Sequence, residues 1–381
     1  MIYIYSSTNR GWLKEKGLFL FDRPVYKIRY KNRILQINDR KIKTDKPLHL
    51  IQKLIKNYYA VGFISYDFKD KTLGRNRIQP VDTLKLPDIY INLYKKYKKI
   101  NNLHGYKSKI IRHRIQESKE EYINKVEKIK EYITVGDIYQ INLAHRIEIE
   151  GFFSVENIFK NLIETQPTDY LMLIKDKDFS LISGSMELFL EKNGDCIISK
   201  PIKGTVKRGK NPEEDEKLKL FLKNNEKERA ENLMITDLMR NDIGRISKSG
   251  SVKVPELFTI EKYSSLYQMS STVEGELKEN VSLKDIIQAT FPPGSVTGAP
   301  KIRAVQIIDQ LEKYKRSVYC GTTFVIKPDS DFVMSVAIRQ SIFKKNRCYI
   351  YIGSGIVADS IPEKEYEETI LKSKANIKSI G

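Results

Sequence analysis

The sequence is poor in several features that mark whole classes of protein. It has three cysteines in 381 residues, with no Cys-x-x-Cys pair, and only four scattered histidines. This pattern excludes a disulfide framework and argues against a zinc site. No run of about 18 apolar residues and no signal-peptide core occur, so we expect a soluble, cytoplasmic chain without a membrane partner. The absence of GxGxxG and GxxxxGKS/T excludes the common dinucleotide and P-loop motifs.

Positive charge is the strongest compositional bias of the chain. Lysine and arginine number 67 against 48 acidic residues, which gives a formal net charge of +19 and a pI near 9.5. Such a charge is compatible with a nucleic-acid-binding protein, and we keep this as the non-enzymatic alternative. The basic residues are spread along the chain, however, and no zinc-finger, RRM or helix-turn-helix signature accompanies them. We therefore expect a solvated basic surface and no nucleic-acid partner.

The chain divides into an N-terminal third and a longer remainder. Residues 1–67 contain short strand-like runs and one helical stretch near 48–58, whereas residues 68–118 are basic and resemble a loop-like connection. We expect residues 1–110 to form a region that packs onto a core formed by residues 111–381.

Local signals in the remainder predict both helices and strands. Ser118 and Glu121 have capping-box spacing, and the apolar residues that follow them lie on one helical face. Asn211-Pro212 predicts a second helix, with a break near 224–225, and Pro362 predicts a final helix. Apolar and polar residues alternate from 141 to 149, as in a half-buried strand. The interspersed elements favour an α+β fold with antiparallel sheets.

Two glutamate pairs occur at helical spacing. Glu228 and Glu231 are three residues apart in KERAENLMITDLMRND, and Glu365 and Glu368 are three apart in PEKEYEET. Residues i and i+3 share a helical face, so each pair can direct two carboxylates to one point. Two such helices facing each other would provide the oxygen ligands that Mg²⁺ prefers. Similar pairs are common on solvated helices, so the spacing alone leaves both interpretations open.

Three glycine-containing segments are candidates for ligand contact: PIKGT (201–205), GSVTGAPK (294–301) and GSGIVADS (353–360). GSVTGAPK predicts a tight turn with Pro300 as the first residue of a helix, whose free N–H groups can bind an anion. GSGIVADS is expected after a strand, and PIKGT places Lys203 beside a glycine that permits an unusual turn. Each segment could also be an ordinary turn.

A tyrosine and an arginine are associated with later strand-like segments. The segments 319–326 and 332–339 would carry Tyr319 and Arg339. An arginine at a strand end can hold a carboxylate through two parallel hydrogen bonds, although a surface ion pair is the alternative.

Taken together and in order, these segments resemble the chorismate-utilising enzymes. The resemblance covers about residues 115–378 through GDIYQINLAHR, SGSMELF, PIKGT, ERAENLMITDLMRNDIGRI, PGSVTGAPKIRA and GSGIVADSIPEKEYEET. It implies a large antiparallel-sheet sandwich surrounded by helices, as in enzymes like anthranilate synthase component I. Within the family the sequence is most similar to aminodeoxychorismate synthase component I, because that group carries PIKGT where anthranilate synthases typically have PIAGT.

The resemblance implies Mg²⁺-dependent amination of chorismate at C4 by ammonia. The product would be 4-amino-4-deoxychorismate, formed through a covalent adduct on Lys203, for 4-aminobenzoate and folate synthesis. Glu187 would protonate the departing hydroxyl. A separate glutamine amidotransferase would supply the ammonia, and no lyase domain is expected in this chain. The implied Mg²⁺ ligands are Glu228, Glu231, Glu365 and Glu368; the implied substrate-binding residues are Gln140, Thr297, Gly298, Tyr319, Arg339, Gly353 and Gly355.

Two points qualify the assignment within the family. Anthranilate synthase component I, which forms anthranilate and pyruvate from chorismate, is the enzymatic alternative, and Lys203 is the discriminating residue. Gln140 lies where water-using relatives carry a lysine, which argues against water as the nucleophile. Gln268 lies where many relatives have histidine, and Met186 where many have proline.

Overall fold

The computed structural model describes residues 1–263 and 266–381. Within these residues the strands form two sheets, and every pairing between named strands is antiparallel. Sheet A contains ten strands, in the spatial order β18 (Gly298–Ala299), β10 (Gln140–Phe152), β22 (Arg347–Ile356), β21 (Gln340–Lys344), β12 (Ser180–Ser185), β11 (Tyr170–Lys175), β1 (Ile2–Ser6), β2 (Gly17–Phe21) and β8 (Lys98–Ile100), with β9 (Lys109–Ile115) also paired to β10. Sheet B contains twelve strands, in the order β15 (Ile202–Lys207), β17 (Leu266–Glu276), β14 (Cys196–Lys200), β13 (Leu188–Asn193), β20 (Phe332–Val336), β19 (Thr322–Ile326), β6 (Tyr59–Ile64), β7 (Ile89–Tyr94), β3 (Tyr26–Lys31), β4 (Ile34–Ile37) and β5 (Arg40–Lys43), with β16 (Lys253–Lys262) paired to β17.

Helices surround the two sheets, which confirms the predicted α+β class. The described residues form α1 (Pro47–Leu54), α2 (Lys69–Thr72), α3 (Lys119–Thr134), α4 (Val155–Thr165), α5 (Pro212–Asn224), α6 (Glu226–Gly244), α7 (Leu283–Thr290), α8 (Lys301–Leu311) and α9 (Pro362–Ile380), with short 3₁₀ turns η1 (Tyr66–Phe68) and η2 (Gly294–Val296). Ser118 caps α3 through a complete capping box, as its spacing predicts. Asn211 caps α5, and Asn225 caps α6 directly after the predicted break.

The main hydrophobic core lies between the two sheets. Strands of sheet A contribute Ile4 and Met172, whereas strands of sheet B contribute Phe63 and Met334, and all four side chains are buried in one cluster. A second cluster packs α4 and the end of α9 against sheet A, and a third packs α3 and α8 against β10. Sheet A is therefore buried on both faces along much of its length, which removes most of its apolar area from water.

The N-terminal third supplies strands to both sheets. The expectation of a loop-like connection over residues 68–118 is wrong, because this segment contains α2, β7, β8 and β9. Its short strands are hard to identify from sequence because β8 and β9 are rich in exposed lysine and arginine. The proposed boundary near residue 110 stays a prediction.

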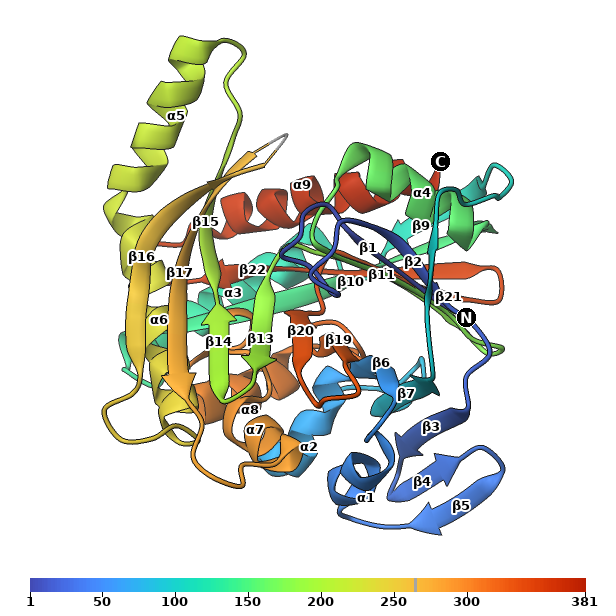
Figure 1. The fold of residues 1–381 in the computed structure, drawn as a ribbon. Helices are drawn as coiled ribbons and strands as arrows, with labels where there is room; N and C mark the ends of the chain where they lie inside the picture. The colour runs from blue at the N-terminus through green and yellow to red at the C-terminus, as the bar shows by residue number, and fades with distance from the viewer. Residues whose placement is uncertain (264–265) are drawn as a thin grey trace.

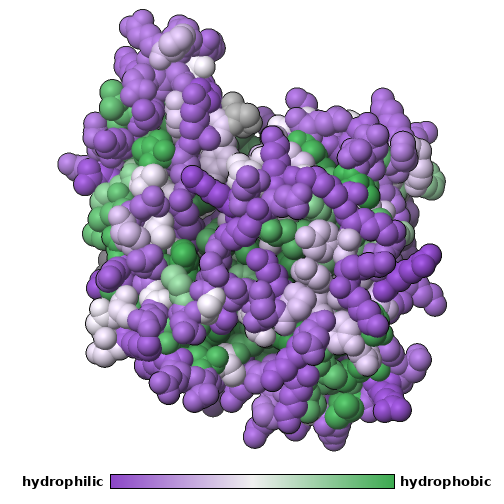
Figure 2. Space-filling view, viewed as in Figure 1, coloured by the Kyte–Doolittle hydropathy of each residue, from purple (hydrophilic) through white to green (hydrophobic). Residues whose placement is uncertain are grey.

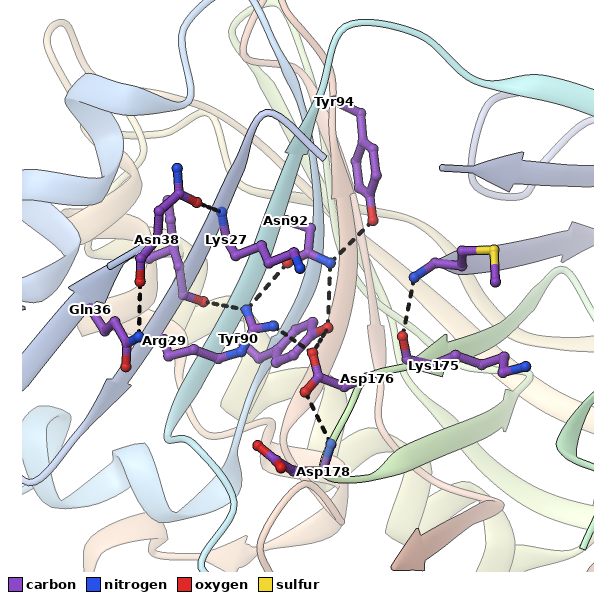
Figure 3. Close-up of polar contacts among 12 residues, drawn as sticks. Lys27, Arg29, Gln36, Asn38, Tyr90, Asn92, Tyr94, Lys175, Asp176 and Asp178 are labelled. Carbon is purple, nitrogen blue, oxygen red and sulfur yellow. Dashed lines mark hydrogen bonds and ion pairs between the residues drawn. The ribbon is translucent and has the colours of Figure 1, made fainter. Parts of the chain in front are cut away.

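A polar network joins the two sheets near this N-terminal part. Figure 3 shows Arg29 of β3 and Tyr90 of β7 directed at Asp176, which follows β11. The Arg29 Nη2 atom lies 2.6 Å from Asp176 Oδ2, and the Tyr90 hydroxyl donates to the same oxygen at 2.8 Å. The Arg29 guanidinium also stacks on the Tyr90 ring at 3.5 Å. These contacts fix the β11–β12 turn of sheet A against sheet B.

One part of the molecule stands out from the body. In Figure 1, α5 projects at the top of the view above the curved ends of β15, β16 and β17. Figure 2 shows that most of the viewed face is hydrophilic. Among residues 1–263 and 266–381, no helix has both the length and the apolar character needed to cross a bilayer.

Candidate active site

A cavity of about 510 Å³, here called the central cavity, lies where the chain passes between the two sheets. Glu187 stands in the crossover from β12 of sheet A to β13 of sheet B, and Arg339 in the crossover from β20 of sheet B to β21 of sheet A. Helices α6 and α9 and strands β15 and β22 complete the walls. The cavity gathers most of the residues that the sequence singled out: Glu187, Lys203, Glu228, Glu231, Tyr319, Arg339, Gly353, Gly355, Glu365 and Glu368 all line it.

The two glutamate pairs face the cavity from two different helices. Glu228 lies in the first turn of α6 and Glu365 in the first turn of α9, where the positive end of each helix dipole favours a carboxylate. Ser360 Oγ donates to Glu365 Oε1 at 2.7 Å. Burial and the charge of Glu231 raise the pKa of Glu228, and burial also raises the pKa of Glu365. Glu228 and Glu231 therefore repel each other, and a cation would relieve this repulsion. At Glu368, by contrast, Lys372 outweighs burial and lowers the pKa of that carboxyl.

The donor chemistry of these glutamates fits Mg²⁺. Within the described residues, no three histidine, cysteine, aspartate or glutamate side chains converge closely enough to form a complete metal centre by themselves. Mg²⁺ does not require such a cage, because it usually binds one or two carboxylates and keeps several waters or substrate oxygens. Carboxylates on two facing helix ends match this requirement.

Lys203 is brought to the cavity by an irregular part of β15. The pairing of β15 with β17 shifts between residues 202 and 205, and Gly204 has a φ of +83°. A Cβ atom on Gly204 would lie 3.0 Å from Glu228 Oε2, so glycine allows the strand to approach α6. The predicted unusual backbone is thus present, but as a bulge within a strand. Lys203 Nζ lies 3.8 Å from Glu231 Oε2.

Glu187 is the buried acid of the site. Only 5% of its surface is exposed. Burial raises its pKa to about 7, although a hydrogen bond with Ser295 and the positive charge of Lys203 act in the opposite direction. Its backbone N–H donates to Ser185 Oγ at 3.2 Å, which fixes the start of the crossover. A carboxyl group with this pKa holds a proton close to neutral pH and can deliver it.

Arg339 and Tyr319 both line the cavity and are the candidate residues for binding an anion. Arg339 adopts a left-handed backbone conformation with φ of +51° in the link between β20 and β21. Its Nη1 donates to the backbone oxygen of Lys372 at 3.3 Å, so most of its donors remain for a ligand. Tyr319 stacks on Tyr351 with the ring centres 5.9 Å apart. Both Tyr319 and Arg339 lie outside the expected strands, in the links before β19 and β21.

Gly353 and Gly355 lie inside β22, and the expectation that GSGIVADS only follows a strand is wrong for its first four residues. A Cβ atom on Gly353 would lie 3.1 Å from the Tyr319 hydroxyl. One on Gly355 would lie 2.9 Å from Gln140 Nε2 and 3.2 Å from Lys203 Nζ. Glycine is therefore needed because the strand runs directly under the polar groups of the site.

Three predicted residues lie beside the cavity and not among its lining residues. Gln140 pairs with Ala299 in β18, and its Nε2 donates to Glu231 Oε2 at 3.4 Å. The Thr297 hydroxyl donates to the backbone oxygen of Pro293, within its own turn. Gly298 packs against the Gln140 backbone, which leaves no room for a Cβ atom. Pro300 caps α8 instead of being its first residue, a shift of one position.

Several lining residues were not identified from the sequence. Asn142 lies two residues after Gln140 on β10, and Lys372 lies four residues after Glu368 on α9, where its Nζ is 2.5 Å from Glu368 Oε1. Strand and helix periodicity could have indicated both. Ser295 and Lys227 also line the cavity, the latter directly before Glu228.

Comparison with known proteins agrees with this geometry. A family model described as chorismate binding enzyme matches residues 3–378. The chain belongs to the chorismate-binding enzyme family. It has the predicted α+β fold. The crystal structure of anthranilate synthase component I from Streptococcus pneumoniae superposes with a TM-score of 0.85 at 29% identity, covering 94% of this chain and 91% of that one.

Two curated relatives illustrate the range of activities in this chorismate-binding family. Anthranilate synthase component 1 of Aquifex aeolicus is 42% identical over 263 residues, which is 69% of this chain and 53% of that protein. Aminodeoxychorismate synthase component 1 of Bacillus subtilis is 35% identical over 355 residues, which is 83% of this chain and 75% of that protein. The chain thus spans about half the length of the first relative and three quarters of the second.

Proposed function

We propose that this chorismate-binding enzyme is an aminodeoxychorismate synthase component I. It would replace the C4 hydroxyl of chorismate by an amino group derived from ammonia, giving 4-amino-4-deoxychorismate for 4-aminobenzoate and folate synthesis. The observation that carries the proposal is Lys203, a primary amine in a cavity that also contains the buried acid Glu187. The similarity to the Bacillus subtilis protein over 83% of the chain supports the same function.

The chemistry proceeds in two displacements. In the first, the Lys203 amine bonds to C2, the two ring double bonds shift, and the C4–O bond breaks. Glu187 gives its proton to the departing hydroxyl, which leaves as water. In the second, ammonia bonds to C4, the double bonds return, and the bond between C2 and the lysine nitrogen breaks. One proton of the added ammonia passes to the Glu187 carboxylate, so that Lys203 and Glu187 regain their starting forms. The sum consumes ammonia and releases water, and covalent catalysis divides one difficult displacement into two easier ones.

Other residues bind and orient the substrate in this proposal. Chorismate is a dianion, and Arg339 with the Tyr319 hydroxyl would hold one carboxylate. Glu228, Glu231, Glu365 and Glu368 would hold Mg²⁺, which when bound supplies positive charge for the other carboxylate. A separate glutamine amidotransferase is our expected source of ammonia.

Anthranilate synthase component I is the second candidate. It is supported by the 42% identity to the Aquifex aeolicus protein and by the fold of the Streptococcus pneumoniae structure. Both candidates act on chorismate, and Lys203 is the residue that separates them, because the proposed amination at C4 passes through an adduct on this lysine, whereas anthranilate synthases typically have alanine in its place.

Product analysis tests the choice. The purified protein is incubated with chorismate, Mg²⁺ and ammonium chloride at alkaline pH, with and without an added aminodeoxychorismate lyase. We expect a non-aromatic aminated product that forms 4-aminobenzoate only when the lyase is added. Fluorescent anthranilate released together with pyruvate would refute the proposal in favour of the second candidate.

A further inference from the structure

Gln268 is a buried amide in the wall of the central cavity that the mechanism above does not use. It lies on β17, opposite Thr205 of β15 and therefore close along the ladder to Lys203. All three residues line the cavity. Only 4% of the surface of Gln268 is exposed.

The two polar atoms of the Gln268 amide differ in their hydrogen bonding. Its Nε2 donates to Thr205 Oγ1 at 3.4 Å, which directs the amide group along the strand pair. Its Oε1 is buried and accepts no hydrogen bond from any residue in 1–263 or 266–381. A buried acceptor without a donor is unfavourable. Other buried acceptors of the described residues, such as Gln79 Oε1, also lack a donor, but Gln268 belongs to the wall of the cavity. The position therefore points to a donor supplied by a ligand.

The chemistry of the reactants limits what that donor can be. Chorismate presents carboxylates, an ether oxygen and a vinyl group, which accept hydrogen bonds or make none, and a single hydroxyl at C4. Ammonia, in contrast, has three N–H donors and one lone pair. To attack carbon, it must direct the lone pair at the ring and its N–H groups at acceptors behind it.

A neutral carbonyl oxygen suits this task better than a carboxylate does. It accepts a hydrogen bond from ammonia without adding a negative charge that would stabilise the protonated, non-nucleophilic ammonium ion. We propose that Gln268 Oε1 accepts a hydrogen bond from the ammonia that attacks the substrate, and so positions this second nucleophile. The inference rests on the amination proposed above.

The test separates ammonia binding from substrate binding. Steady-state rates are measured for the wild type and Gln268→Met with ammonium chloride as the ammonia source, each substrate being varied at saturation of the other. Methionine keeps the chain length but accepts hydrogen bonds poorly. We expect KM for ammonia to rise roughly three- to tenfold, the effect of losing one hydrogen bond, while KM for chorismate stays within about twofold. Gln79→Met, at another buried amide whose Oε1 lacks a partner and which lies outside the cavity, should change neither constant.

A second variant tests the role of the neutral charge. In Gln268→Glu the carboxylate would stabilise the protonated ammonium ion, which is not a nucleophile. The pH at which kcat/KM for total ammonia increases should therefore be higher than in the wild type. A proportional rise of KM for chorismate in Gln268→Met, or an unchanged KM for ammonia, would show that the amide serves the C4 hydroxyl or the packing, and would overturn the proposal. If Gln268→Met does not fold, the pH profile of Gln268→Glu decides, and an unchanged profile counts against it.

The outcome is independent of which product forms. If the product is anthranilate, the KM for ammonia can still be measured and still tests the role of Gln268, whereas the proposed function is refuted. If the enzyme turns over chorismate without any dependence on ammonia, both fail.

Discussion

At the scale of single residues, Lys203 and Glu187 share one cavity but have different surroundings. Lys203 is half-buried beside Glu231, whereas Glu187 is enclosed at the crossover. We predict that Lys203→Ala loses roughly 10²- to 10⁴-fold in kcat, because the covalent route is removed, while chorismate binding is mostly kept through Arg339. Trapping the wild-type reaction and mapping the adduct by mass spectrometry should place it in the peptide containing residues 201–205.

The matched control for Lys203 is Lys207→Ala. Lys207 is exposed, lies on the same strand and does not line the cavity. It should leave turnover unchanged. Unchanged turnover in Lys203→Ala itself would remove the nucleophile from the mechanism.

Glu187 leads to a prediction about pH. Its carboxyl has a pKa of about 7 in the folded protein against 4.5 as the ordinary value, so the folded state binds the proton more tightly. Its contribution to stability is complete below pH 4.5 and is lost as the pH rises through 7. The difference in unfolding free energy between the wild type and Glu187→Gln should therefore fall by about 3 kcal/mol from pH 4 to pH 8, as measured by urea titration. Glutamine cannot deliver a proton, so kcat of the variant should also fall by roughly 10²- to 10⁴-fold.

A pH-independent stability difference would contradict the burial argument for Glu187. A normal kcat in Glu187→Gln would separately contradict its role as the acid. The two measurements therefore test the electrostatics and the mechanism independently.

At the scale of elements, α6 and α9 form a pair because each contributes two glutamates to the lining of the cavity. We predict that Glu368→Gln raises the Mg²⁺ concentration needed for half-maximal rate by about tenfold, since one oxygen ligand loses its charge. Glu367→Gln is the control, because Glu367 is its exposed neighbour and lies outside the cavity. An unchanged Mg²⁺ dependence in Glu368→Gln would show that α9 contributes no metal ligand.

Element boundaries illustrate what local sequence can predict. The starts of α3, α6 and α9 were predictable because each depends on a cap or a proline that acts within one turn. The strands β3, β4 and β5 were not predicted, since β4 and β5 have only four residues each, β5 is exposed throughout, and the alternation of β3 spans only six residues. β3 also depends on its pairing with β7, which lies far away in the sequence and which no local pattern encodes.

The site likewise combines features that the local sequence predicts with features that it does not. The spacing of Glu365 and Glu368 was readable from the helix period, and their convergence with the pair on α6 was expected only through family resemblance. The strand was expected to end at residue 353, but pairing with the neighbouring strand β10 extends β22 to Ile356. The orphan oxygen of Gln268 depends on contacts that no local pattern encodes.

At the scale of the whole molecule, the net charge of +19 allows a direct test of the nucleic-acid alternative. We predict only weak binding to duplex DNA that disappears by about 150 mM salt, because non-specific binding falls steeply with ionic strength. A gel-shift titration over salt concentration measures this. Tight binding at 150 mM salt that resists competitor DNA would contradict the prediction.

Strand pairing across the whole molecule determines whether the N-terminal third is a separable unit. Strand β1 pairs with β11 in sheet A, and β6 pairs with β19 in sheet B, so removal of residues 1–110 would expose an unpaired edge in each sheet and open the core between them. We predict that a fragment of residues 111–381 does not unfold cooperatively when it is heated and tends to aggregate.

The variant Asp176→Asn perturbs the contact between the N-terminal strands and the rest of the chain without removing any strand. It keeps every strand but weakens the network with Arg29 and Tyr90 that joins the sheets (Figure 3). We expect a loss of roughly 1–3 kcal/mol in unfolding free energy with the transition still cooperative, because a charge-assisted hydrogen bond is replaced by a neutral one. A stable, cooperative 111–381 fragment would show instead that the C-terminal part folds on its own and that the N-terminal strands only pack onto it.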